Sequence, residues 1–177
     1  MKKSFIKKFN PKILPFKKLP IEYQYAMIWY MTFDGEAWEW PDDKWQDSIW
    51  WKGKQTNTSW QKHVSYMKKY MKKHINYFID TYGDEKFGMV EVPTDVICKE
   101  VAKREDNENL NDFDSFEEYH QWYIKNMKET FPKHRKTNRW PCILSTRYSD
   151  DVIEDGWHRF HCYIKRKDKT IPCLFYV

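Results

Sequence analysis

The fold of this chain is decided around residues 152–161, which read VIEDGWHRFH. An apolar pair is followed by Asp155 and Gly156 and then by a run of helical character, so we expect a short strand, a tight turn and a helix. Free backbone N–H groups and the helix dipole gather where such a helix begins, and both favour an anion there. The stretch therefore predicts a turn that holds a phosphate or similar anion, although a purely structural turn would use the same residues.

The side chains of this turn suggest individual roles. Gly156 lets the backbone turn sharply and approach a ligand. His158 and Arg159 add hydrogen-bond donors and positive charge, while Asp155 is suited to hold a cation or accept a proton. Because a guanidinium that faces an anion leaves no buried partner behind, we expect Arg159→Ala to weaken anion binding with little loss of stability.

The segments around the turn predict a small mixed sheet in the C-terminal half. Apolar, β-rich runs bounded by proline or polar residues indicate strands, and the helix after Gly156 is expected to continue to about Lys165. The predicted strands are 87–92, 141–146, 151–154 and 170–177.

The N-terminal half is predicted to be mainly helical. Apolar residues recur every three or four positions in several segments, and Ser115 with Glu118 forms a capping box. Three prolines and seven lysines near the start indicate an extended basic arm over 1–20, with no regular helix. We therefore expect an α+β protein with a helical region 21–86 and an α/β region 87–177 that carries an insert at about 105–138. The predicted helices are 21–33, about 42–51, 58–83, 95–104 and one that starts after Ser115.

Composition limits the class of protein. The 177 residues are 41% hydrophobic and 19% aromatic, which predicts a folded chain of about one domain. No apolar run approaches the roughly 18 to 20 residues of a membrane-spanning helix, and no signal peptide is evident, so we expect a cytoplasmic protein with no membrane partner. The four cysteines lack CxxC spacing, which favours reduced thiols.

Four segments together resemble the core of the ParB/sulfiredoxin superfamily. They are VEVPTD at 90–95, ILS at 143–145, the DGWHR turn at 155–159 and TIPCL at 170–174. The superfamily includes CTP-hydrolysing partition proteins, free-serine kinases, sulfinic acid reductases and proteins described as nucleases. Trp157 stands where the reductases have a cysteine, and no helix-turn-helix segment follows the motif as it does in partition proteins. The match is closest to serine-kinase-like and phage-encoded members, which would place the protein in the host cytoplasm.

The resemblance implies a site for a nucleotide or phosphorylated small molecule. Gly156, Trp157, His158 and Arg159 would contact the ligand, and Asp155 with His158 would be catalytic. The implied ligands are ATP or CTP with Mg²⁺, and the implied reactions are phosphoryl transfer or NTP hydrolysis. A second carboxylate would be needed as base, for which the sequence offers Glu91, Asp95, Glu100 or Glu154.

Two other hypotheses stay open. His158, His161 and Cys162 form an H-x-x-H-C cluster that could hold zinc, although no partner cluster is evident and no metal ligand is assigned. A non-enzymatic protein that engages DNA or a host protein, for example as a counter-defence factor, would use the basic arm and exposed aromatic residues. This binding protein would tolerate Asp155→Asn, whereas an enzyme would need Asp155 and a divalent metal.

Overall fold

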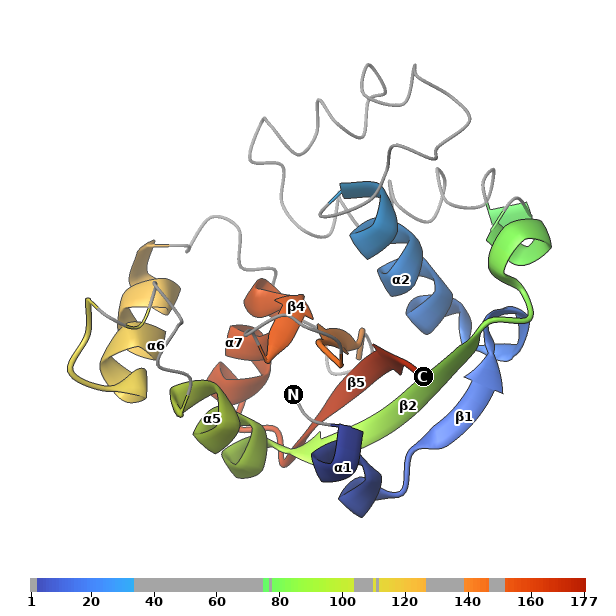
Figure 1. Ribbon diagram of the computed structural model, residues 1–177. Coiled ribbons are helices and arrows are strands. Elements are labelled where there is room, and N and C mark those ends of the chain that lie inside the picture. The colour runs from blue at the N-terminus through green and yellow to red at the C-terminus, as the bar shows by residue number, and fades with distance from the viewer. Residues whose placement is uncertain are drawn as a thin grey trace.

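A computed structural model describes most of the sheet and the helices that flank it (Figure 1). The described residues are 3–33, 75–76, 78–103, 110, 112–126, 139–146 and 152–177. Several predicted features lie outside these residues: the short helix at 42–51 with the loop after it, the acidic aromatic run 34–47, the long helix up to residue 74, most of the polar loop at 105–114, and the basic loop at 132–138.

A mixed five-stranded sheet forms the centre of the fold, with the strand order β1-β2-β5-β3-β4. Strands β2 and β5 are the longest pair and run antiparallel, with Gly88 opposite Phe175. Strand β3 is parallel to β5 and antiparallel to β4. The strands are β1 (Lys12–Pro15), β2 (Lys86–Pro93), β3 (Cys142–Leu144), β4 (Ile153–Asp155) and β5 (Thr170–Tyr176). The α+β class and all four predicted strands are confirmed.

The alternation of side chains along the strands divides the core into two clusters, one on each face of the sheet. On one face, Phe87, Ile143 and Leu174 pack with buried residues of α2 (Ile21–Phe33). On the other face, neighbouring strand positions pack with residues of α5 (Thr94–Ala102) and α7 (Trp157–Lys165). Helices therefore cover both faces, and α7 lies beside β3 and β5 (Figure 1).

The predicted helices that fall within the described residues are confirmed. Helix α2 begins at Ile21, and residues 78–82 are helical up to the turn at Gly83. Helix α6 (Phe116–Asn126) follows Ser115, whose Oγ accepts a 3.2 Å hydrogen bond from the amide of Glu118. The carboxylate of Glu118 in turn accepts a 2.9 Å hydrogen bond from the amide of Asp114. The capping signal in the sequence thus sets where α6 begins.

The first 18 residues are less extended than the sequence predicts. One helical turn, α1 (Lys3–Ile6), precedes the first proline, and the 3-10 turns Lys7–Phe9 and Phe16–Lys18 flank β1. Strand β1 pairs antiparallel with β2 at the edge of the sheet, a position that tolerates proline. The buried side chains of Ile6 and Phe16 hold the segment against the core, and the side-chain amide of Gln24 donates to the carbonyl of Phe16 (3.0 Å). The expectation of an arm without regular helix is therefore wrong at α1, and the segment is part of the fold.

No helix in the described part of the chain has the length and apolar character needed to cross a membrane.

Candidate functional site

The predicted turn has the backbone that its sequence requires. Strand β4 ends at Asp155, and Gly156 follows with φ 99° and ψ 22°, in the left-handed region that glycine adopts without strain. Gly156 is the N-cap of α7, and its carbonyl accepts the first helical hydrogen bond from the amide of Phe160 (2.8 Å). Gly156 has no side chain of its own that could cap α7. The start of the helix is the end at which its dipole favours an anion.

Arg159 lies beneath this turn. Its side chain is 2% exposed, and Nη2 lies 2.5 Å from Oδ2 of Asp155. A Cβ built on Gly156 would lie 2.7 Å from the same Nη2, so the guanidinium is packed directly under the glycine. The expectation that Arg159 has no buried partner is wrong. Its guanidinium pairs with the carboxylate of Asp155, four residues earlier in the chain.

His158 is held by a residue from another helix. Its Nδ1 lies 3.0 Å from the hydroxyl of Tyr123 on α6, and its side chain is half-buried. Trp157 is also half-buried and meets the ring of Phe160 edge-on, with centroids 5.8 Å apart. The two residues that start α7 are thus fixed by aromatic contacts and are only partly open to solvent.

Glu154, the residue before Asp155, accepts a hydrogen bond from the hydroxyl of Tyr30 on α2. The thiol of Cys142 on β3 contacts the carbonyl of Gly156 at 3.6 Å. Burial raises the pKa of this thiol to about 12, so it stays neutral. Side chains from β3, α2 and α6 therefore fix the turn and its flanks from three sides.

The other candidate carboxylates do not lie at the turn. Glu91 is on β2, and two strands, β5 and β3, separate β2 from β4. It forms an ion pair with Arg139 (2.8 Å) and accepts a hydrogen bond from Thr170. Asp95 and Glu100 are on α5, where Glu100 pairs with Lys103. Of the four, the structure brings only Glu154 next to Asp155.

The zinc hypothesis gains no ligand set. Among the described residues, no group of three or more His, Cys, Asp or Glu side chains is arranged to hold a metal ion. His161 is instead fully buried among aromatic rings, and burial raises the pKa of the Cys162 thiol to about 12.

Comparison of the chain with protein-family models, with curated proteins and with solved structures finds no match. What the turn can bind is therefore inferred from its own contacts alone.

Three contacts of the site could not be found from sequence. Tyr30, Tyr123 and Cys142 all reach the turn from elements distant in the chain. In the sequence, Tyr123 is marked only as one of the apolar positions of α6. Nothing in the sequence marks Tyr30 or Cys142 as contacts of the turn, because packing decides which side chains meet across the fold.

Proposed function

We propose that the protein binds a nucleotide or another phosphorylated ligand at the start of α7. The observation that carries this proposal is Gly156 in the left-handed conformation as the N-cap of α7, directly after β4. The helix dipole favours a phosphate at the start of α7, where Gly156 turns the backbone from β4 into the helix. The resemblance of residues 155–159 to the phosphate-binding turn of the ParB/sulfiredoxin superfamily gives independent support.

The roles of the turn residues follow from their surroundings. In this proposal Gly156, Trp157 and His158 contact the ligand through their backbone and through the half-buried side chains. Arg159 acts from below, where its ion pair with Asp155 fixes the shape of the turn. ATP and CTP are the first ligands to test. Mg²⁺ is expected as the ion that accompanies the nucleotide.

Ligand binding fits these contacts better than catalysis does. Phosphoryl transfer or NTP hydrolysis needs a group that accepts a proton, and the candidates here are Asp155 and His158. Asp155 is engaged by Arg159, and the neighbouring Glu154 is engaged by Tyr30. Turnover would require Asp155 to leave a buried partner, so we propose binding as the primary function.

A pair of variants at His158 separates ligand binding from folding. His158→Asp adds a negative charge in the first turn of α7. The helix dipole stabilises this charge, but the charge repels a phosphate. In the His158→Asn variant the new side chain has nearly the same shape as aspartate and carries no charge. We expect the Asp variant to be at least as stable as the Asn variant and to bind nucleotide roughly tenfold more weakly, the factor for about 1.4 kcal/mol.

The measurement is a thermal-shift and calorimetric titration with ATP, CTP and GTP, each with and without Mg²⁺. A ligand at about 100 times its dissociation constant should stabilise the native protein by roughly 2.7 kcal/mol. Equal affinity of the Asp and Asn variants, or no response of the native protein to any of these nucleotides, would reject the proposal.

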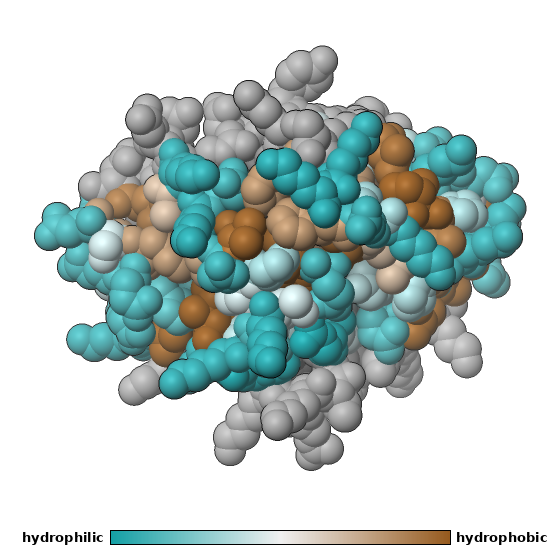
Figure 2. Space-filling model, turned by 90° about the horizontal axis from the view of Figure 1, so that it is seen from below, coloured by the Kyte–Doolittle hydropathy of each residue, from teal (hydrophilic) through white to brown (hydrophobic). Residues whose placement is uncertain are grey.

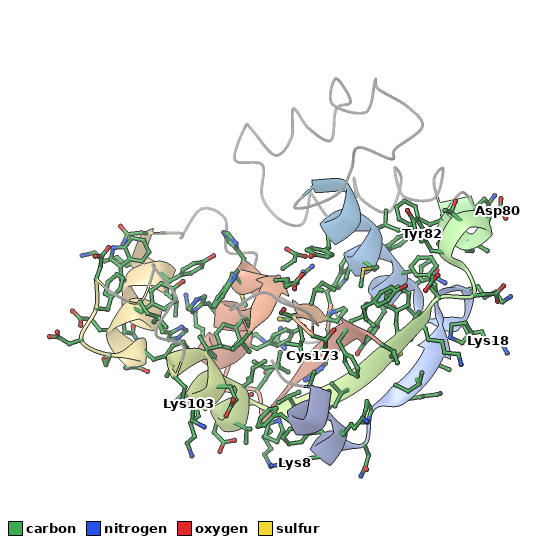
Figure 3. All side chains as sticks on the ribbon, viewed as in Figure 1. Lys8, Lys18, Asp80, Tyr82, Lys103 and Cys173 are labelled. Atoms are coloured by element: carbon green, nitrogen blue, oxygen red, sulfur yellow. The ribbon has the colours of Figure 1, made fainter. Side chains whose placement is uncertain are left out.

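A second candidate function is binding of DNA along the edge of the sheet. Exposed lysines follow one another along β1 and the turns beside it, and Lys8 and Lys18 point outward in Figure 3. On the face seen in Figure 2, hydrophilic and hydrophobic residues are interspersed, without one dominant apolar surface. Lysines also protect a sheet edge from unwanted pairing, so the charge has a structural explanation as well.

The DNA hypothesis is tested by changing four of these lysines to glutamine and measuring affinity for a short duplex at several salt concentrations. Phosphate contacts predict a smaller salt dependence in the variant. The variant carries glutamine at Lys7, Lys8, Lys12 and Lys18, and the matched control carries it at the exposed Lys99, Lys125, Lys165 and Lys169. An equal effect of both sets would reject a specific basic edge.

A further inference from the structure

Helices α6 and α7 meet through a pair of buried histidines. Nδ1 of His120 lies 2.7 Å from Nδ1 of His161, and the two side chains are 3% and 0% exposed. Beside them, the hydroxyl of Tyr123 contacts His158. We call this contact, formed by His120 and Tyr123 of α6 with His158 and His161 of α7, the histidine joint.

The short contact assigns a proton to each ring. One Nδ1 must donate a hydrogen and the other must accept it, so the accepting ring is neutral. Burial of both rings disfavours a second proton on the donating ring, so both imidazoles are neutral and have opposite tautomers. Nε2 of His161 is buried and has no hydrogen-bond partner among the described residues. A buried N–H without an acceptor is rarer than a buried acceptor without a donor. We therefore assign the donated hydrogen to Nδ1 of His161 and the accepting lone pair to Nδ1 of His120.

Either added proton damages this arrangement. A proton on Nδ1 of His120 places two N–H groups against each other at 2.7 Å. A proton on Nε2 of His161 creates a buried charge whose N–H has no acceptor among the described side chains. Both changes are removed once the two helices separate and water reaches the rings.

Aromatic rings surround the pair and keep water out. Tyr123 stacks on His161 with centroids 4.0 Å apart, and Phe116 is nearly parallel to both histidines at 6.3 Å. Burial lowers the pKa of His120. Burial, together with His120 and His158, lowers the pKa of His161 to about 2.

The charged groups near the joint do not offset this effect. On α6, Glu117 favours a charged His120, but Lys165 on α7 opposes it. His158 and Cys162 are the other titratable groups of α7 at this interface, and Tyr119 and Tyr123 are those of α6. Helix α5 contributes Cys98, whose pKa burial raises to about 12. Asp155 on β4, a mostly buried carboxylate, acts on Tyr123 of this group, but it is paired with Arg159.

Helix α6 has few other anchors. Its buried residues are Tyr119, His120 and Tyr123, and two of these belong to the joint. Trp122, on the same helix, is 43% exposed. Helix α6 also stands at one end of the molecule, away from β1 and β2 (Figure 1). Loss of the joint removes the two hydrogen-bonded contacts between α6 and α7 described above, while the ring contact of Phe116 with Phe160 (centroids 6.0 Å) remains.

We propose that the histidine joint is an acid-sensitive contact, and that protonation of His120 and His161 releases α6 from α7 while the sheet stays folded. Release takes Tyr123 away from His158 and opens the start of α7. The joint itself is independent of the ligand, whereas any change in ligand affinity on release rests on the proposed function.

Hydrogen exchange of the native full-length protein tests this release. Protection factors, which remove the intrinsic pH dependence of exchange, are measured by mass spectrometry between pH 7 and pH 5. We expect protection of residues 116–126 to fall by roughly tenfold per pH unit for each histidine below about 6.5. Peptides from β2 and β5 should stay more protected than residues 116–126 at every pH, and their protection should stop falling once α6 has separated.

Two outcomes overturn the proposal. Protection of α6 that stays constant to pH 5 would mean that the pair does not respond to acid. Protection of α6 that equals that of β2 and β5 at every pH would mean that α6 opens only when acid unfolds the whole protein. Neither result depends on a nucleotide, so failure of this proposal and failure of the proposed function are distinguishable.

Variants identify the responsible groups. His161→Phe keeps an aromatic ring and cannot titrate, and His120→Asn keeps an acceptor near the position of Nδ1. The double variant should lose the acid response, and His120→Asn alone should reduce it. His158→Asn removes the third histidine of the joint and leaves the contact between His120 and His161, so this variant should retain most of the response. If the double variant keeps the native acid response, the assignment to His120 and His161 is overturned. If α6 is already unprotected in the double variant at pH 7, the acid responses of His120→Asn and His158→Asn are compared instead, and equal responses overturn the assignment.

Discussion

Nη2 of Arg159 lies 2.5 Å from Oδ2 of Asp155, and only 2% of the arginine side chain and 11% of the aspartate side chain are exposed. This ion pair joins the first turn of α7 to the end of β4, directly under Gly156. Removal of one partner leaves a charge buried without compensation, which is one of the more costly single changes in a protein.

We therefore predict that Arg159→Ala lowers the free energy of unfolding by about 3 to 5 kcal/mol, in contrast to the small loss expected from sequence. Urea unfolding at pH 7 measures this change. The double variant Arg159→Ala with Asp155→Ala should lose less than the sum of the two single variants, because neither charge is then left alone. A loss below about 1 kcal/mol, typical of an exposed pair, would contradict the buried ion pair.

Gly88 on β2 has no room for a side chain. A Cβ at this position would lie 2.0 Å from Cζ of Phe175, its partner across the strand pair. We predict that Gly88→Ala destabilises the protein by roughly 1 to 3 kcal/mol through overpacking. Denaturant midpoints check this, and adding Phe175→Leu to the same protein should recover part of the loss. A neutral Gly88→Ala would mean that the ring of Phe175 lies elsewhere.

The N-cap of α6 gives a local prediction. Ser115 accepts the amide hydrogen of Glu118, so Ser115→Ala should cost about 1 kcal/mol and lower the hydrogen-exchange protection of residues 116–126. Ser115→Asp retains a capping oxygen and should keep the native protection. If the Asp and Ala variants are equally damaged, the serine stabilises α6 by some contact other than capping.

Stability should fall on the acid side. His161 has its pKa lowered from 6.5 to about 2 by burial and by the neighbouring His120 and His158. Below pH 6.5 the unfolded chain takes up a proton that the folded protein excludes. Below pH 6.5, the contribution of this histidine should therefore lower the unfolding free energy by about 1.4 kcal/mol for each pH unit. Above pH 6.5 its contribution should not change with pH.

Urea unfolding of the native protein and of His161→Phe between pH 7.5 and pH 5 checks the sign and size of this effect. The Phe variant should have a shallower dependence by one proton. The decrease should also level off at the pH where α6 separates, since His161 is then hydrated in both states. Stability that rises as the pH falls would contradict a neutral, buried His161.

The four thiols should differ in reactivity. Burial raises the pKa of Cys142 and Cys162 to about 12 and the pKa of Cys173 well above its usual value, and Figure 3 places Cys173 inside the fold. Cys98 also has a raised pKa, but it is half-buried. We predict that iodoacetamide at pH 8 labels Cys98 slowly and labels the other three only after denaturation. Mass spectrometry of the labelled peptides would contradict this if Cys142 reacted first.

Local patterns in the sequence were enough to predict the elements around the site. The glycine after β4, the capping box before α6 and the apolar, β-rich run of β2 are each signals contained within a few residues. Such signals act in any context, because the backbone conformation of Gly156 or the N-cap hydrogen bond of Ser115 needs no distant partner. The strand, turn and helix at residues 153–165 therefore appear where the sequence predicts them.

Only the tertiary structure decided where the side chains of the site point. Arg159 had two destinations within reach, an anion in solvent or the carboxylate of Asp155, and in the folded protein it is buried under Gly156 and paired with Asp155. His120 and His161 are 41 positions apart, and β1 joins the sheet only because β2 offers it an edge. Such contacts depend on how whole elements pack against each other, which is a property of the complete core, whereas helix starts and turns are determined by a few neighbouring residues.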